Sequence, residues 1–399
     1  MSGFEKQRLG RLRDVMAAHV AKGTIPGTVT ALRRHGEVHV DEVGTMAFGS
    51  GPPMARDTIF RISSMTKPIT AVAALILVEE CRLRLDDPVD RLLPELADRR
   101  VLRQPNAALD DTVPAERPIT LRDLLTFTWG LGMIFAMPGT MPIQAAMEER
   151  LGRTGPPAPG ETLTPDTWMA GLGTLPLVHQ PGASWMYNTG SEVLSVLIER
   201  AAGQPFPTFL QERIFEPLGM VDTGFSVPAA DLGRLATSYI TDPQTGAPTV
   251  YDEPEGQWSQ PPAFASGAGG LVSTVDDYLA FAHMLLDGGR HGGERILSRP
   301  SVELMTTDQL TAEQKAATNW VPGAFDSHGW GFGVSVRTRR DDPASVGQYG
   351  WDGGMGTSWA SDPREGLIGV LLTQGTWASP SPPDVCRDFW TCAYQALDD

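Results

Sequence analysis

Two side chains near the start of the sequence have the types and spacing needed to form a covalent ester with a substrate. Ser64 and Lys67 stand three residues apart, directly before a helix-like apolar run over residues 71–80. Positions i and i+3 of a helix share a face, so the hydroxyl and the amine are expected to lie side by side. A serine hydroxyl is a weak nucleophile, but a lysine kept uncharged by burial or by a neighbouring cation could take its proton. The pair predicts an activated serine, although the same spacing also occurs at ordinary helix starts.

A tyrosine further along the chain is the third candidate. Tyr187 follows the Pro181-Gly182 turn and precedes a predicted helix over residues 191–202. If Tyr187 lies beside Lys67, the cation would favour the ionised phenol, which could then accept and return a proton. A loop tyrosine on its own is more often a packing residue, so this role depends on the other two side chains.

The segment 348–357 is rich in glycine and leads into a predicted strand. Glycine lets backbone N–H groups approach a ligand closely. An oxyanion hole needs such N–H groups aimed at the negative charge that develops in the reaction. We expect the backbone N–H groups of Ser64 and Gly354 to be this pair.

The elements that must position these residues are predicted at both ends of the chain. Residues 28–34 and 37–43 have the pattern of strands joined by the turn His35-Gly36, and residues 330–337, 357–362 and 367–373 have strand patterns before a final helix over 383–396. Between the strands at the two ends of the chain, most of the predicted elements are helices. This order predicts an α/β (α+β) fold, an antiparallel sheet flanked by helices with a mostly helical lobe inserted. We expect residues 1–75 and 256–399 to form a discontinuous sheet domain, residues 76–255 a helical domain, and the active site to lie between them.

A long segment over residues 133–182 is rich in proline, glycine and methionine and is expected to be irregular. Methionine adapts to varied shapes, so the apolar side chains here could line a pocket: Met133, Phe135, Met137, Met141 and Met147. Plain packing beneath a long loop explains the same composition equally well.

Composition narrows the possible partners. The 399 residues carry a formal charge of −16, which argues against nucleic acid because its binding depends on lysine and arginine. The three cysteines, Cys81, Cys386 and Cys392, lack metal-ligand spacing and are expected to be reduced thiols. The longest apolar run, 69–78, is too short to cross a bilayer, and the first 23 residues lack a signal-peptide pattern. We expect a cytoplasmic protein with no nucleic-acid or membrane partner.

The sequence resembles the beta-lactamase-related serine hydrolase superfamily, which includes class C beta-lactamases, penicillin-binding DD-peptidases and family VIII carboxylesterases. The similarity covers residues 15–396 and rests on five motifs in the order of that family: Ser64-x-x-Lys67, Thr126-x-Thr128-x-Gly130-Leu, Pro-Gly-x-x-Trp-x-Tyr187, Gly269-Gly-Leu-x-Ser-Thr and Gly-Trp351-x-Gly353-Gly. The resemblance implies a beta-lactamase/transpeptidase-like fold with Ser64 as nucleophile, Lys67 as base and Tyr187 as proton relay. It implies no cofactor and no metal.

Departures from the family pattern carry information on the substrate. Penicillin-recognising members usually have Tyr-x-Asn, where this chain has Thr189, and Lys-Thr-Gly, where it has Trp351-Asp352-Gly353. An indole cannot pair with a substrate carboxylate, and Asp352 would repel one if it faces the site. Losing one such charge-assisted contact weakens substrate recognition by roughly 1.5–3 kcal/mol. The esterase branch typically has Trp-x-Gly here, so the sequence favours an esterase, with Trp129, Thr189, Trp351, Asp352 and Gly353 as the expected substrate-binding residues.

These observations predict a cofactor-free carboxylesterase that forms an acyl-enzyme on Ser64 and takes a small-molecule ester as its partner. On the same site, an acyltransferase or an amide or beta-lactam hydrolase is the alternative. A catalytically silent ligand-binding homologue is a third hypothesis, which a serine-directed fluorophosphonate would separate from the others.

Overall fold

The sheet at the centre of the molecule is built from both ends of the chain. The computed structural model describes residues 3–49, 51–137, 139–152, 155–242, 244–318 and 320–398. Seven antiparallel strands lie in the order β11-β12-β13-β14-β15-β1-β2. Their bounds are β1 Gly27–Arg34, β2 Glu37–Gly44, β11 His328–Trp330, β12 Ser335–Arg337, β13 Tyr349–Gly353, β14 Thr357–Asp362 and β15 Leu367–Thr373. Because β1 pairs directly with β15, the two ends of the sequence share one sheet.

The strand predictions are confirmed for both hairpins of the sheet core and wrong in one place. β1 and β2 are joined at His35 and Gly36, whose positive φ angles of 49° and 83° suit a two-residue hairpin turn. β14 and β15 coincide with the predicted strands over residues 357–362 and 367–373. The single strand predicted over 330–337 is instead two strands, β11 and β12. The chain reverses between them, where Gly333 has a φ of +69° and a Cβ at Gly331 would collide with the Met305 carbonyl oxygen.

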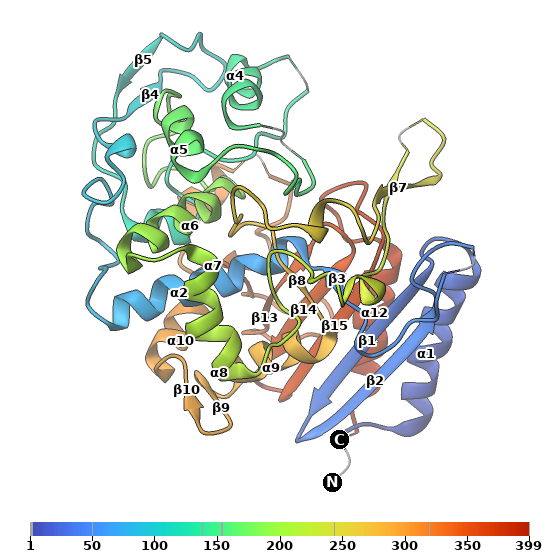
Figure 1. Cartoon of the computed structure of the whole chain (residues 1–399). Coiled ribbons are helices and arrows are strands. Elements are labelled where there is room, and N and C mark those ends of the chain that lie inside the picture. Colours follow the sequence, from blue (N-terminus) through green and yellow to red (C-terminus); the bar gives the residue numbers. More distant parts are fainter. Residues whose placement is uncertain are drawn as a thin grey trace.

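Helices cover both faces of this sheet (Figure 1). On one face, α1 (Lys6–Ala21) and α12 (Asp384–Gln395) pack against each other and against strands β2 and β15, burying Leu12, Met16 and Phe389. On the other face lies α9 (Val275–Leu286), which contacts β1, β14 and β15. The helix predicted over 383–396 is therefore present, and the mixed α/β fold with an antiparallel sheet is confirmed.

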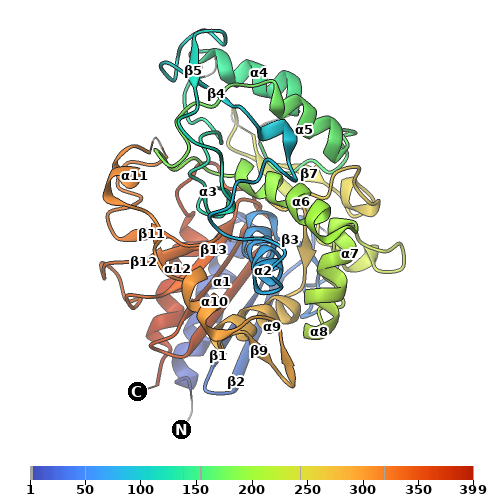
Figure 2. The same cartoon turned by 90° about the vertical axis from the view of Figure 1, so that its left-hand side faces the viewer.

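A mostly helical lobe sits at one end of the sheet (Figure 2). It comprises α3 Leu121–Leu125, α4 Pro142–Leu151, α5 Pro165–Gly173 and α6 Thr189–Ala202. From this lobe, α7 Phe206–Leu210 and α8 Glu216–Leu218 lead back alongside the sheet, where α8 contacts α9. Helix α2 (Thr66–Glu79) lies between lobe and sheet and packs against α6. Its residues from Thr66 to Leu77 are all buried, so α2 is the shared core element of the two halves.

The remaining described elements are short. Helices α10 (Arg299–Met305) and α11 (Ala312–Ala316) precede β11, and four strand pairs lie outside the main sheet: β3 Phe60–Arg61 with β8 Val272–Ser273, β4 Arg100–Leu102 with β5 Thr112–Pro114, β6 Ser238–Thr241 with β7 Pro248–Asp252, and β9 Arg290–His291 with β10 Glu294–Arg295. The β3–β8 pair ties the segment before α2 to the segment before α9. Among the described helices, none combines the length and the apolar character that a bilayer-spanning helix needs.

Candidate active site

The Ser64 hydroxyl and the Lys67 amine meet at the start of α2. A single helical turn over Ser63–Met65 leads directly into the helix, so the two side chains lie on one face. Lys67 Nζ is 2.9 Å from Ser64 Oγ and 2.6 Å from the carbonyl oxygen of Ala268, which precedes β8. The side chain of Lys67 is 0% exposed, whereas Ser64 is partly exposed to a cavity. The amine is thus held between the serine it could deprotonate and a fixed carbonyl acceptor.

Burial changes the charge of this lysine. Loss of solvation disfavours the ammonium form and lowers the pKa of Lys67 to about 7, although the nearby Glu192 carboxyl opposes this shift. A large share of the protein therefore carries a neutral amine near neutral pH. A neutral amine has a free electron pair and can accept the Ser64 proton, which is the property that the sequence argument required.

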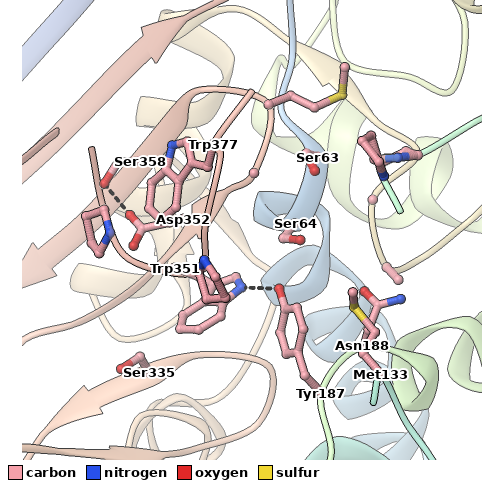
Figure 3. Close-up of a pocket in the computed structure, with 18 of the residues that line it drawn as sticks. Ser63, Ser64, Met133, Tyr187, Asn188, Ser335, Trp351, Asp352, Ser358 and Trp377 are labelled. Carbon is pink, nitrogen blue, oxygen red and sulfur yellow. Dashed lines mark hydrogen bonds between the residues drawn. The ribbon is translucent and has the colours of Figure 1, made fainter. Parts of the chain in front are cut away.

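Tyr187 completes the group of three side chains. Lys67 Nζ lies 4.5 Å from the centre of the Tyr187 ring, and the indole N–H of Trp351 donates a hydrogen bond of 2.7 Å to the phenol oxygen (Figure 3). Burial raises the pKa of Tyr187 well above its ordinary value, and the Asp352 charge adds to this, while hydrogen bonds with Ser64 and Trp351 oppose it. The expectation that Lys67 would favour an ionised phenol is therefore not met. Tyr187 rests as a neutral phenol, suited to donating a proton.

Strained backbone flanks these side chains. Asn188 adopts φ 83° and ψ −68°, and the N–H of Thr189 donates to the Tyr187 carbonyl oxygen at 3.3 Å, which closes a tight three-residue turn. Ser63 also has a positive φ, of 46°. Such conformations in residues other than glycine are unfavourable by about 1–3 kcal/mol each and concentrate at functional sites. Here they fix the direction in which Tyr187 and Ser64 leave the backbone.

Gly354, the second residue expected in the oxyanion hole, lies directly after β13. Among the described residues, none accepts a hydrogen bond from the N–H of Ser64 or of Gly354. The two segments are held together because Thr357 Oγ1 donates to the Ile62 carbonyl oxygen at 3.1 Å. Gly353 lies against the same carbonyl, where any Cβ would collide. Glycine at this position allows the end of β13 to approach the nucleophile.

A cavity of about 960 Å³ opens beside these groups. Ser64, Tyr187, Trp351 and Gly354 line it, and Met133, Phe135 and Met147 from the segment predicted to be irregular line it as well. Met137 is instead 77% exposed. Cavities of roughly 300–1,000 Å³ hold drug-sized ligands, so the space exceeds what a short acyl group fills.

Of the residues predicted to bind substrate, some line the cavity and others do not. Trp351 and Asp352 line the cavity, and so does Thr189, although its hydroxyl is engaged by the Leu131 carbonyl oxygen at 2.9 Å. Trp129 is 0% exposed and is absent from the lining, so it is a core residue rather than a substrate contact. Gly353 is also absent from the lining. Its lack of a side chain lets the backbone of β13 come close to the Ile62 carbonyl oxygen.

Glu192 is a cavity residue that sequence reasoning missed. It lies on α6, and its Oε1 accepts a hydrogen bond of 2.8 Å from the Ser266 hydroxyl, while its buried Oε2 has no partner among the described residues. Burial raises the pKa of Glu192, and the charge of Lys67 opposes that shift. Its position five residues after Tyr187 carries no motif that would have indicated this contact.

Replacing Glu192 by glutamine is expected to move the acidic limb of the pH profile of kcat/KM to lower pH. In the wild type, activity should rise as Lys67 loses its proton near pH 7, because only the neutral amine can act as base. The Glu192 carboxylate raises the Lys67 pKa, so its removal should lower that pKa further. Initial rates on a neutral ester from pH 5 to 9 measure the shift. An unmoved limb would show that Glu192 carries no charge in this pH range.

No group of three or more acidic, histidine or cysteine side chains within the described ranges is arranged to hold a metal ion. The site instead consists of a serine, a buried lysine and a tyrosine between an antiparallel sheet and a helical lobe. This arrangement is that of the serine hydrolases with the beta-lactamase fold.

Comparison with known proteins identifies the family. The beta-lactamase family profile matches residues 12–384, and the chain belongs to this family. Protein Rv1367c of Mycobacterium tuberculosis is 41% identical over 373 residues, covering 88% of this chain and 86% of that protein. Esterase EstB of Burkholderia gladioli is 31% identical over 398 residues, covering 94% and 92%. Among solved structures, EstCE1, described as a hydrolase with promiscuous acyltransferase activity, superposes with a TM-score of 0.80 at 27% identity, covering 97% of this chain and 99% of that one.

Proposed function

We propose that the protein hydrolyses carboxylic esters of small or medium size through an acyl-enzyme on Ser64. The observation that carries the proposal is the 2.9 Å contact between the Ser64 hydroxyl and a lysine amine whose pKa burial lowers to about 7. A serine beside a neutral amine is an activated nucleophile. The esterase relatives of the family and the Trp351-Asp352-Gly353 sequence in place of a carboxylate-binding lysine support an ester as the substrate.

In the acylation half-reaction, Lys67 Nζ takes the proton from Ser64 Oγ while Oγ bonds to the ester carbonyl carbon. The carbonyl oxygen becomes an oxyanion, which the N–H groups of Ser64 and Gly354 would stabilise. The neutral phenol of Tyr187 donates its proton to the leaving alcohol oxygen as the C–O bond breaks, and the ammonium of Lys67 returns a proton to Tyr187. The alcohol departs, and the acyl group stays on Ser64.

The deacylation half-reaction repeats these steps with water. Water loses a proton to the Lys67 and Tyr187 pair as its oxygen bonds to the acyl carbon. The same backbone N–H groups would hold the second oxyanion. The bond between that carbon and Ser64 Oγ then breaks, Oγ regains a proton, and the carboxylic acid leaves.

Incubation of the wild-type protein with a fluorophosphonate, together with a chain-length series of p-nitrophenyl esters and nitrocefin, tests the proposal. We expect one added mass on the peptide that contains Ser64 and turnover of short or medium esters at higher kcat/KM than nitrocefin. Absence of the adduct would contradict a serine nucleophile and favour a silent ligand-binding protein. Faster hydrolysis of nitrocefin than of any ester would instead assign a beta-lactam hydrolase.

Acyl transfer is the second candidate function, favoured by the size of the cavity. Its volume of about 960 Å³ leaves room for an acyl group on Ser64 and an organic acceptor beside it. The similar structure EstCE1 is described as having promiscuous acyltransferase activity. Added alcohols would then compete with water for the acyl-enzyme, and mass spectrometry of the products measures the ratio of transferred ester to free acid.

A further inference from the structure

Asp352 presents a carboxylate that the machinery described above does not use. β13 and β14 pair so that Asp352 lies opposite Ser358, with both side chains on one face of the sheet. The Ser358 hydroxyl donates to Asp352 Oδ1 at 2.5 Å, and the Trp390 indole N–H of α12 donates to Ser358 Oγ at 2.9 Å. In the described chain, no group donates a hydrogen bond to the other oxygen, Oδ2. One half of the carboxylate is therefore held rigidly, and the other half is left for a ligand.

This carboxylate belongs to the same cavity as the nucleophile. Asp352 lines the cavity, and its charge raises the pKa of Tyr187, which places it within electrostatic reach of the reacting groups. Figure 3 shows Trp351 pointing to Tyr187 and the adjacent Asp352 pointing to Ser358 instead. Gly354, whose N–H has no acceptor among the described residues, follows two residues later at the turn after β13, and two residues of chain span at most about 7 Å. A substrate group at Asp352 would thus lie several bonds from the carbonyl carbon.

Among the described residues, no cation of the cavity forms an ion pair with Asp352. Two arginines among the described lining residues, Arg337 and Arg387, form ion pairs with Asp341 and Asp342 and with Asp384, respectively. Loss of solvation raises the pKa of Asp352 to about 6, so it is still mostly ionised at neutral pH. An enclosed carboxylate with a single hydroxyl donor is unfavourable unless something compensates its charge.

The surroundings of Asp352 suit a positively charged ligand. The Trp377 and Trp390 side chains line the cavity, with the Trp377 backbone N–H bonded to the Gly354 carbonyl oxygen at 2.8 Å and Trp390 bonded to Ser358 as above. Indole faces attract ammonium groups, most strongly where water is excluded. Glu192 adds a second acidic side chain to the lining. A carboxylate substrate would meet repulsion here, whereas an ammonium group would find both a charge partner and aromatic walls.

We propose that Asp352 anchors a subsite for an amine or quaternary ammonium group of the substrate, so that the ester cleaved at Ser64 carries such a cation about four bonds from its carbonyl carbon. This inference rests on the proposed esterase function and specifies its substrate class. The competing explanation, that Asp352 only ties β13 to β14 and α12 through Ser358, requires an acceptor oxygen but no charge.

Two pairs of esters that differ only in charge separate these explanations. On the acyl side, p-nitrophenyl 4-(trimethylammonio)butanoate is compared with p-nitrophenyl 5,5-dimethylhexanoate; on the alcohol side, benzoylcholine is compared with 3,3-dimethylbutyl benzoate. In at least one pair we expect the wild type to prefer the cationic ester by about 10- to 100-fold in kcat/KM. In Asp352→Asn, which keeps an acceptor for Ser358, that ratio should fall to near one.

Asp87→Asn is the matched control, since Asp87 is an exposed carboxylate that pairs with Arg84 outside the cavity lining, and its loss should leave the charge preference intact. The subsite would be overturned if the wild type turned over the neutral ester of both pairs as well as or better than the cationic one. It would also be overturned if the preference for the cationic ester survived in Asp352→Asn.

Calorimetric binding of the four esters to Ser64→Ala keeps the test independent of turnover and of the Asn variant. Tighter binding of a cationic ester without turnover of any ester would support the subsite and contradict the esterase proposal; equal binding within both pairs would overturn the subsite.

Discussion

Ser64→Ala is expected to abolish turnover of p-nitrophenyl butyrate, lowering kcat/KM by about 10⁴-fold or more. Among the described residues, the Ser64 hydroxyl is the only hydroxyl that contacts the Lys67 amine, and the substitution removes it with little change in the shape of the cavity. Without Oγ, no covalent intermediate can form, and any remaining rate reflects binding and the backbone N–H groups alone. Steady-state kinetics measure the loss, and intact-mass analysis should show that the fluorophosphonate adduct is lost with it.

Ser63→Ala is the matched control for this prediction. Ser63 is the preceding residue of the same helical turn and also lines the cavity, but its hydroxyl makes no contact with Lys67 in the described structure. Alanine loses the same atom at a backbone position with the same positive φ, so the variant should keep most of its activity and its adduct. If Ser63→Ala were the inactive variant and Ser64→Ala the active one, the assignment of the nucleophile would be wrong.

The parts of this molecule that sequence predicted well are those governed by local rules. The hairpin of β1 and β2 follows from alternating side chains around His35 and Gly36, and the Ser64 and Lys67 contact follows from helical spacing. A Pro-Gly turn and a helix start likewise bracket Tyr187 in the sequence. None of these features requires knowledge of distant residues, because each is decided within about one turn of chain.

Features decided by distant contacts were not accessible in the same way. The buried position of Trp129 depends on packing within the lobe, although its motif suggested a substrate contact. The break between β11 and β12 depends on the approach of Gly331 to Met305 of α10. Helices α4 and α5 had a signal that was overlooked, because each begins with a proline at its first position, Pro142 and Pro165, where proline is favoured.

The charge states of Lys67 and Tyr187 also depend on how deeply each side chain is buried, and no sequence motif indicates that. The sequence-based prediction requires Lys67 to be a cation beside Tyr187 and a neutral base beside Ser64, and these two roles conflict. The structure resolves the conflict, since enclosure lowers the pKa of Lys67 and raises that of Tyr187. Tyr187 is then neutral and Lys67 becomes mostly neutral above pH 7, so the tyrosine starts as the proton donor and the lysine as the acceptor.

Lys67→Met is expected to lower kcat/KM by about 10³- to 10⁴-fold, because methionine fills a similar volume but cannot accept the Ser64 proton. Lys6→Met, at an exposed position of α1, removes the same charge far from the site and should leave the rate unchanged. Rates on p-nitrophenyl butyrate at pH 8, where the wild-type amine is mostly neutral, measure both variants. A Lys67→Met variant with near wild-type activity would rule out the lysine as the base.

The same substitution is expected to stabilise the fold, which separates loss of the base from loss of structure. In the unfolded chain Lys67 has its ordinary pKa of 10.5, whereas in the folded protein its pKa is about 7. Between these values the unfolded state binds the proton that the folded state has lost, so the stability of the wild type rises with pH. Burial of the amine is therefore most unfavourable at and below pH 7, where Lys67→Met should raise the free energy of unfolding by roughly 1–3 kcal/mol, after the lost bond to Ala268 is offset. Urea unfolding at pH 7 and pH 9.5 measures this gain in stability, which should be smaller at the higher pH. If Lys67→Met were less stable than the wild type at pH 7, that result would contradict the neutral buried amine on which the mechanism depends.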